Sequence, residues 1–195
     1  MILPVVAYGD PILRKIGKEI DQNYPDLSTL IENMWETMEN ANGVGLAAPQ
    51  IGKSIRLFVI DATPFADDED LTKDEKEMLI SFRKVFINPI IKSEEGDEWV
   101  FEEGCLSIPE IKEDVWRQET IHITYQDEHF NTHEATYNGL AARVFQHEYD
   151  HIEGVLFTDK LSSLKKRLIK KKLEGVSKGK IGADYRMRHY NAKRK

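Results

Sequence analysis

The sequence predicts an α+β fold, in which antiparallel β-sheets surround a central helix that carries candidate metal ligands and a C-terminal helix packs outside. Two observations favour this class. Strand-like segments follow one another at short spacing, which suits antiparallel pairing, and two amphipathic helical patterns come after them. The chain has 195 residues, 41% of them hydrophobic and 31% charged. Such values are typical of one globular domain and exclude a disordered, collagen-like or membrane-spanning chain.

The first helix is expected from about Thr29 to Ala41. Thr29 and Glu32 have the spacing of a capping box, and one face of the segment is apolar. Residues 43–52 contain too much Gly and Pro for a regular helix, and the apolar run at 55–60 predicts a buried strand. The apolar face of the helix comprises Leu30, Ile31, Met34, Met38 and Ala41.

The middle of the chain combines an acidic segment with several candidate strands. Residues 67–77 contain seven acidic residues and two lysines, which indicates a solvated loop or a short surface helix. The strands are expected at residues 85–91, 98–101, 119–125 and 133–137.

A second helix is predicted over residues 139–152, with Asn138 as its cap and Gly154 as its stop. Four residues at spacings of four, three and four share one face. This face changes along the helix from apolar to ligand-bearing: Leu140, Val144, His147 and His151.

A third helix is expected to begin at Asp159 and to end near Glu174, because Gly175 follows as a stop. Its apolar stripe would be Leu161, Leu164 and Leu168. We therefore divide the chain into a catalytic domain, residues 1–174, and a basic tail, residues 175–195, which we expect to be partly disordered.

The charges are divided unevenly along the chain. The formal net charge is −7, which by itself argues against a nucleic-acid partner. However, residues 160–195 hold 14 basic and 2 acidic residues, whereas the residues before them hold 13 basic and 32 acidic residues. The sequence thus joins an acidic body of net −19 to a basic segment of net +12.

Cysteine content and the N-terminal segment indicate the cellular compartment. The single cysteine, Cys105, excludes an intramolecular disulfide. The N-terminal residues have the pattern of neither a signal peptide nor a transit peptide, and no apolar window has the length of a membrane span. We expect a cytoplasmic protein without a membrane partner.

The strongest chemical signal is the pair His147 and His151 with Glu148 between them. Two imidazoles at i and i+4 of a helix lie close enough to bind one metal, and the intervening glutamate lies beside it. Apolar neighbours predict that both imidazoles are buried and therefore need a partner. The alternative is a solvated helix that fits the pattern by chance.

A metal held by two histidines needs a third ligand and an open position for catalysis. No further histidine follows at the spacing of the extended zincin pattern. Glu174 lies at a suitable distance along the chain, but in a lysine-rich helix. Cys105 is the other candidate, although a lone cysteine is often an inert apolar residue. Gly104 and Pro109 beside it favour a close and rigid backbone approach.

Three segments resemble the signature motifs of bacterial-type peptide deformylases and come in the family's order: residues 43–52, 103–107 and 146–151. Residues 9–14 are similar to the start of that family. The resemblance covers about residues 1–165, and does not clearly include the acidic segment or the tail.

The resemblance implies that Cys105, His147 and His151 bind one divalent metal, with water in the fourth position. Ferrous iron is the implied physiological ion, and Zn²⁺, Ni²⁺ or Co²⁺ are able to occupy the site. A thiolate and two imidazoles suit both iron and zinc, so the residues themselves do not choose between them.

The resemblance also implies the catalytic roles. Glu148 would take a proton from the attacking water and deliver it to the departing amine. The side-chain amide of Gln50 and the backbone N–H of Leu106 would stabilise the oxyanion. Glu103 and Arg117 match a pair that would brace the site through an ion pair.

The implied substrate is a nascent peptide that begins with N-formylmethionine, and the implied products are formate and a free N-terminal methionine. Gly45 would bond the peptide backbone as an added strand. Four residues match positions in the wall of an apolar methionine pocket, but each is equally well explained as core. They are Val44, Phe101, Leu140 and Val144.

Two other functions stay open at this point. One is a zinc metallopeptidase of the His-Glu-x-x-His type, and the other is a non-enzymatic protein that binds RNA or the ribosome. For a monomeric deformylase, the basic tail would dock on ribosomal RNA with strong salt dependence, although a solvated helix face explains its lysines equally well. Truncation after Glu174 is then expected to weaken ribosome binding and to spare turnover of a small formyl peptide.

Overall fold

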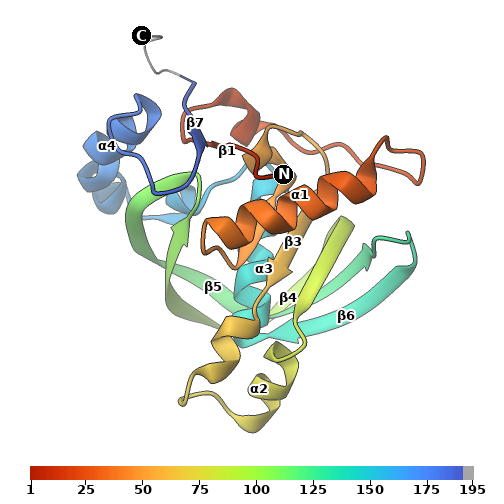
Figure 1. The fold of residues 1–195 in the computed structure, drawn as a ribbon. Helices are drawn as coiled ribbons and strands as arrows, with labels where there is room; N and C mark the ends of the chain where they lie inside the picture. The colour runs from red at the N-terminus through yellow and green to blue at the C-terminus, as the bar shows by residue number, and fades with distance from the viewer. Residues whose placement is uncertain (191–195) are drawn as a thin grey trace.

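The structure is a computed structural model and describes residues 1–190. Five antiparallel strands form the main sheet in the order β2-β3-β4-β5-β6, and β1 and β7 form a separate parallel pair (Figure 1). The strands are β1 (Val5–Val6), β2 (Gly45–Ala47), β3 (Leu57–Asp61), β4 (Arg83–Cys105), β5 (Ile108–Gln126), β6 (Thr132–Asn138) and β7 (Met187–Arg188). The helices are α1 (Leu27–Asn40), α2 (Lys73–Leu79), α3 (Gly139–Ile152) and α4 (Ser163–Ser177). The predicted α+β class and antiparallel sheet are confirmed.

Strands β4 and β5 form one long hairpin. The predicted strands 85–91 and 98–101 are parts of the single strand β4, because the ladder to β5 continues after each of several register shifts. Residues 92–97, which connect these two predicted strands, are exposed. Their polar sequence is therefore explained by contact with solvent, and they belong to the strand and not to a loop. The ladder ends where Cys105 pairs with Ile108, which places Cys105 at the tip of the hairpin.

Helix α3 runs through the middle of the molecule (Figure 1), and its bounds are those predicted. Ten of its 14 residues are buried. The ring of Phe145 packs against Phe58 and Phe86 with centroids 5.1 and 5.0 Å apart. Burying one such apolar side chain contributes about 1.5–3 kcal/mol, so this packing fixes the helix against the sheet. Asn138 precedes the helix but makes no side-chain capping bond.

Helix α1 begins two residues earlier than predicted, at Leu27. The capping box predicted for Thr29 and Glu32 does not form, because both residues already lie inside the helix and Asp26, with a positive φ of 52°, precedes it. The apolar face predicted for this helix is confirmed, since Ile31 and Met34 are buried.

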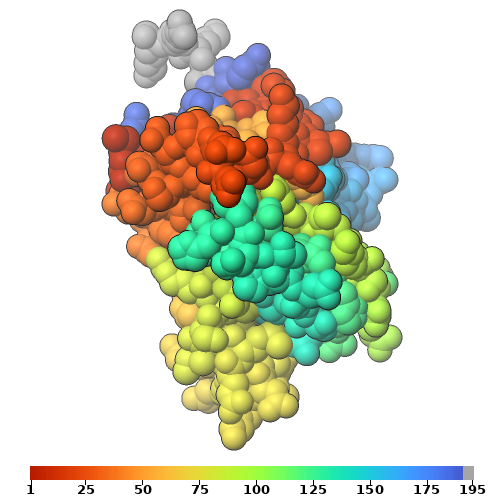
Figure 2. All heavy atoms as spheres, turned by 90° about the vertical axis from the view of Figure 1, so that its right-hand side faces the viewer, coloured from red at the N-terminus to blue at the C-terminus, as the bar shows by residue number. Residues whose placement is uncertain are grey.

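The acidic segment forms a surface projection at one end of the molecule, visible in yellow in Figure 2. The projection consists of a short 3₁₀ helix, Thr63–Asp67, which ends where the acidic segment begins, and then α2. Thr72 and Glu75 form a capping box here: the Thr72 N–H donates to Glu75 Oε2 at 2.8 Å, and the Glu75 N–H donates to Thr72 Oγ1 at 3.3 Å. The prediction of a short surface helix is confirmed.

The start predicted for the last helix is wrong. Helix α4 begins at Ser163, and the Ser162 hydroxyl accepts a hydrogen bond from the Lys165 N–H. Asp159 instead lies in a separate 3₁₀ turn, where it accepts a hydrogen bond from the Leu156 N–H and pairs with Arg14.

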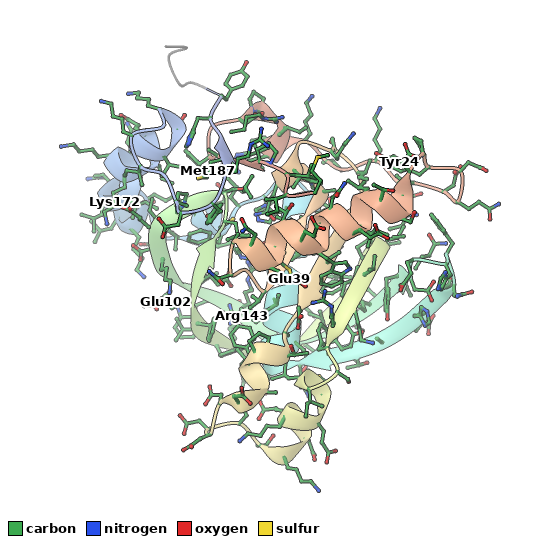
Figure 3. The ribbon with its side chains drawn as sticks, viewed as in Figure 1. Tyr24, Glu39, Glu102, Arg143, Lys172 and Met187 are labelled. Carbon is green, nitrogen blue, oxygen red and sulfur yellow. The ribbon has the colours of Figure 1, made fainter. Side chains whose placement is uncertain are left out.

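The apolar stripe predicted for this helix is also largely wrong. Leu161 is buried but precedes the helix, whereas Leu164 and Leu168 are 64% and 71% exposed. The packed face holds Ile169, Leu173 and Val176. Helix α4 therefore turns two leucines and a row of cations to solvent; Lys172 lies at this periphery in Figure 3.

The described part of the tail packs against the body. The expectation that residues 175–195 are partly disordered stays a prediction. Strand β7 pairs with β1, with Val5 opposite Met187. His189 Nδ1 lies 2.9 Å from the Val176 carbonyl oxygen. Residues 191–195, which belong to the same predicted tail, lie outside the described residues. Within residues 1–190, no helix combines the length and the apolar character that crossing a membrane requires.

Candidate metal centre

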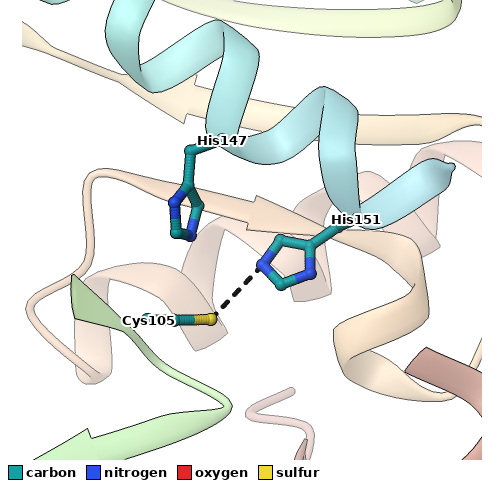
Figure 4. Close-up of side chains that lie close together, drawn as sticks. All are labelled: Cys105, His147 and His151. Atoms are coloured by element: carbon teal, nitrogen blue, oxygen red, sulfur yellow. Dashed lines mark hydrogen bonds between the residues drawn. The ribbon is translucent and has the colours of Figure 1, made fainter. Parts of the chain in front are cut away.

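The side chains of Cys105, His147 and His151 converge beside α3 (Figure 4). Helix α3 presents the two imidazoles one turn apart, and the tip of the β4–β5 hairpin presents the thiol. One ligand atom from each residue lies within 4.8 Å of the others, and Cys105 Sγ is 3.3 Å from His151 Nε2. The sequence-predicted trio thus comes together from segments more than 40 positions apart.

The donor set fits a small divalent metal ion. Ligand bonds of about 2.3 Å to sulfur and 2.0 Å to nitrogen in a tetrahedron would separate the two donors by about 3.5 Å. The 3.3 Å between Cys105 Sγ and His151 Nε2 agrees with that spacing. His147 Nδ1 lies 2.9 Å from Glu103 Oε2. A carboxylate in this position holds the ring so that its other nitrogen is available as a ligand.

Glu148 lies beside this trio and is fully buried. Its Oε2 atom has no hydrogen-bond partner among the described residues. Burial raises the pKa of Glu148 to about 7, because a carboxylate loses its hydration there. The side chain passes over Gly45 so closely that a Cβ atom at Gly45 would lie 2.3 Å from Glu148 Oε1. Glycine at this position therefore makes room for the glutamate.

Glu103 is the centre of a buried ion-pair network. Arg117 donates two hydrogen bonds to it, at 2.7 and 3.0 Å, and Arg143 donates a third at 3.0 Å. Burial alone would raise the pKa of Glu103, but the hydrogen bonds from Arg117 and His147 outweigh burial and hold it well below its usual range. Arg117 also donates to Asp150 at 2.8 Å. The predicted pairing of Glu103 with Arg117 is present in the structure.

Gln50 presents its amide NH₂ to the site. The Ala47 N–H donates to Gln50 Oε1 at 2.8 Å, and because a backbone N–H is only a donor, this bond fixes which end of the amide is oxygen. Gln50 Nε2 then lies 3.5 Å from Cys105 Sγ and 3.4 Å from the Ser107 hydroxyl. Leu106 directly follows Cys105, and its carbonyl accepts a hydrogen bond from Tyr185 at 2.8 Å.

A cavity of about 630 Å³ opens onto these groups. Its wall includes Glu148, His147 and Cys105, together with Gln50 and Leu106. Four of the five predicted substrate-binding residues line it: Val44, Gly45, Phe101 and Val144. Leu140 does not belong to the lining and packs in the apolar core with Phe145.

Arg143 is a member of the site that sequence reasoning missed. It is 2% exposed, lines the cavity, and lies over the Trp99 ring with its guanidinium carbon 4.3 Å from the ring centroid. Figure 3 labels it in the lower middle of the molecule. One signal was available: Arg143 is four residues before His147 on the buried face of the predicted helix, where a cation needs a partner.

Other residues considered as ligands lie elsewhere. Glu174 is on the exposed side of α4 and pairs with Lys178, so the structure removes it as the third ligand. His122 lies 2.8 Å from Thr136 Oγ1 and His133 lies 2.8 Å from Asp127 Oδ2, whereas His129 is exposed.

A buried glutamate with one carboxylate oxygen unpartnered within residues 1–190, next to a Cys-His-His trio at the wall of a cavity, is the arrangement of a metal-dependent hydrolase. Comparison with known sequences gives the family. The sequence profile described as polypeptide deformylase matches residues 2–167, and the chain belongs to that family. This membership favours deformylation over the metallopeptidase alternative.

Relatives and solved structures agree with the family. A peptide deformylase of Christiangramia forsetii is 65% identical over 194 residues, which cover 100% of this chain and 99% of the relative. One of Flavobacterium johnsoniae is 60% identical over 194 residues, with the same coverage. The crystal structure of a peptide deformylase from Legionella pneumophila superposes with a TM-score of 0.76 at 41% identity, covering 89% of this chain and 94% of that chain.

Proposed function

We propose that this chain hydrolyses the N-formyl group of N-formylmethionine at the start of newly synthesised polypeptides and releases formate. Membership of the deformylase family supports the reaction. The observation that carries the mechanism is the buried Glu148 beside the Cys105, His147 and His151 trio, with its Oε2 atom unpartnered among the residues that the structure describes.

Cys105, His147 and His151 would hold one divalent ion, which would supply Lewis acidity to the reaction when bound. We take this ion to be Fe²⁺, with Zn²⁺, Ni²⁺ or Co²⁺ as substitutes, following the family resemblance. The thiolate and imidazole donors accept all of these ions.

Glu148 acts as the general base and acid. Its raised pKa, about 7, suits a group that takes a proton from water and gives it to the amine that leaves. The side-chain amide of Gln50 and the backbone N–H of Leu106 donate to the formyl oxygen as negative charge develops on it. Gln50 needs no rearrangement for this role, because Ala47 already fixes the orientation of its amide.

The substrate backbone pairs with the free edge of β2. The Val44 carbonyl accepts from the Asp61 N–H in β3, whereas the Ala47 N–H points to Gln50. Alternation along an antiparallel strand then directs the polar groups of Gly45 away from β3, where a peptide adds as a further strand. The methionine side chain lies against Val44, Phe101 and Val144, which line the cavity.

We propose that the enzyme is a cytoplasmic monomer that meets its substrate at the ribosome. The basic residues of α4 support this, because they form an exposed cationic surface on an otherwise acidic protein. Binding to ribosomal RNA through such a surface would weaken steeply with added salt.

The test compares three peptides with anaerobically purified, iron-loaded protein. Release of formate from formyl-Met-Ala is expected, with no turnover of acetyl-Met-Ala and no cleavage of an internal peptide bond. Equal turnover of all three would show a peptidase or amidase of broad specificity instead. Metal analysis of the same preparation identifies the ion.

A further inference from the structure

The described tail reaches the back of the turn that carries Cys105 and Leu106. The Tyr185 hydroxyl donates to the Leu106 carbonyl oxygen at 2.8 Å. The next carbonyl, that of Ser107, accepts from the Tyr8 N–H at 2.8 Å. Tyr8 follows β1, which pairs with β7 just beyond Tyr185. Both peptide units after Leu106 are therefore held by these two terminal segments.

The same tail contacts the turn that carries Gln50. This 3₁₀ turn, Ala48–Ile51, ends at Gly52, whose φ is +83°. The guanidinium of Arg188 lies over Gly52 so closely that a Cβ there would be 3.0 Å from both of its terminal nitrogens. Arg188 is itself held by Asp10, with 3.4 Å between Nη2 and Oδ2. The tail thus packs against the loops of both groups assigned to the oxyanion.

We propose that residues 185–188 position these two oxyanion donors, with Tyr185 as the positioning residue for the backbone N–H of Leu106. This inference rests on the proposed function, because it concerns the donors of that reaction. It assigns a role in the site to a segment outside residues 2–167, the part of the chain that the family profile matches.

The physical reason lies in the connection between the two bonds at Leu106. The carbonyl bound by Tyr185 is separated from the N–H of Leu106 only by that residue's φ and ψ. Fixing the carbonyl therefore limits the directions in which the N–H points, and donors that need no reorientation stabilise a developing oxyanion best. Burial raises the pKa of Tyr185 further above neutrality, so the hydroxyl stays a donor.

The test replaces Tyr185 by phenylalanine, which removes the hydroxyl and keeps the ring. Tyr190→Phe is the matched control, because Tyr190 is in the same tail and is 62% exposed. With formyl-Met-Ala, Tyr185→Phe is expected to lower kcat about five- to tenfold, the effect of losing one hydrogen bond. KM, metal content and Tm should stay near those of the control.

A second measurement is independent of turnover. In zinc-loaded protein labelled with ¹⁵N-leucine, the amide resonance of Leu106 should shift in Tyr185→Phe and not in Tyr190→Phe. Unchanged kcat and an unchanged Leu106 resonance would overturn the proposal, as would a fall in metal content or Tm that accounts for the whole loss of activity. If the unmodified protein released no formate, the proposed function would fail, while the amide shift would still test positioning.

Discussion

Glu148 combines three properties that suit a catalytic carboxylate. It is buried, one of its oxygens has no partner among the described residues, and it lies next to two imidazoles. Leaving a buried carboxylate unpaired costs stability. Gly45 shows how the fold accommodates this group, since its missing side chain leaves the space that Glu148 fills. The two residues are therefore coupled by shape as well as by their assigned roles.

Gly45→Ala tests that coupling. A methyl group 2.3 Å from Glu148 Oε1 forces the glutamate to move, so we expect kcat for formyl-Met-Ala to fall at least tenfold. The glutamate is not assigned as a metal ligand, so metal content should be kept. Gly182→Ala is the matched control, because nothing lies within 4 Å of a Cβ at Gly182. Equal activity of the two variants would contradict the steric account.

Glu148→Ala separates proton transfer from metal binding. We expect full metal content and a loss of kcat of about 10²- to 10⁴-fold, the usual contribution of a general acid or base. Metal analysis together with formate release measures both quantities. Normal turnover in this variant would disprove the acid–base role.

Cys105→Ser tests the third ligand. A serine hydroxyl is a poor substitute for a thiolate, so metal content and activity are expected to fall together after dialysis against a weak chelator. Full occupancy with full activity would remove Cys105 from the ligand set. The structure gives no reason for a large change in packing, because the two side chains are nearly the same size.

At the scale of secondary structure, sequence patterns predicted α3 well and α4 poorly. The bounds of α3 follow from a long apolar face that meets the sheet on several sides. In α4 only one narrow side is covered, and the choice among Leu164, Leu168 and Ile169 depends on the neighbours that tertiary packing supplies. In the same way, the cap expected at Thr29 was lost because α1 starts earlier, after Asp26.

Glu103 of the β4–β5 hairpin forms ion pairs and hydrogen bonds with side chains of helix α3. The substitution Glu103→Gln tests how much these contacts stabilise the protein. Removing one charge takes the buried Arg143 out of its ion pair and leaves Arg117 with Asp150 alone, which is expected to lower the free energy of unfolding by about 3–5 kcal/mol. The neighbouring change Glu102→Gln is the control, since Glu102 is exposed and pairs loosely with Lys112. We expect it to cost no more than about 1 kcal/mol in denaturant unfolding.

At the scale of the whole molecule, the packed tail changes one expectation drawn from the sequence. Truncation after Glu174 was expected to spare turnover of a small formyl peptide. Such a truncation would also remove Val176, which is fully buried, and Tyr185 with its bond to Leu106. We now expect it to reduce activity and stability. Truncation is therefore unsuitable as a test of ribosome binding.

Charge reversal on α4 provides that test without removing the tail. Lys170→Glu with Lys171→Glu changes two exposed cations, and we expect weaker ribosome binding with a shallower dependence on salt. Turnover of formyl-Met-Ala should stay unchanged. Lys73→Glu with Lys76→Glu, in the acidic segment, is the matched control. Equal ribosome binding by both double variants would show that the cations of α4 are a solvated surface and do not bind the ribosome.

The sequence was sufficient for the fold class, the central helix and the pair His147 and His151, which depend on local periodicity and on a motif of fixed spacing. Cys105 was selected as the third ligand through the family resemblance, because residue spacing alone left Glu174 as an alternative. The pairing of Val5 with Met187 could not be predicted from the sequence, because a two-residue strand shows no hydrophobic period and its partner strand lies far along the chain. Arg143 was missed for a related reason, since its role depends on Glu103, which another element supplies.

The β1–β7 pairing also constrains the order in which the molecule is completed. The chain is synthesised from its N-terminus. Strand β1 can therefore pair with β7 only after nearly all the residues between them have been made. With the positioning role proposed for Tyr185, the turn at Leu106 gains its support only after that late segment has emerged. A newly made copy would therefore reach full activity after its own translation, and would process other chains more slowly until then.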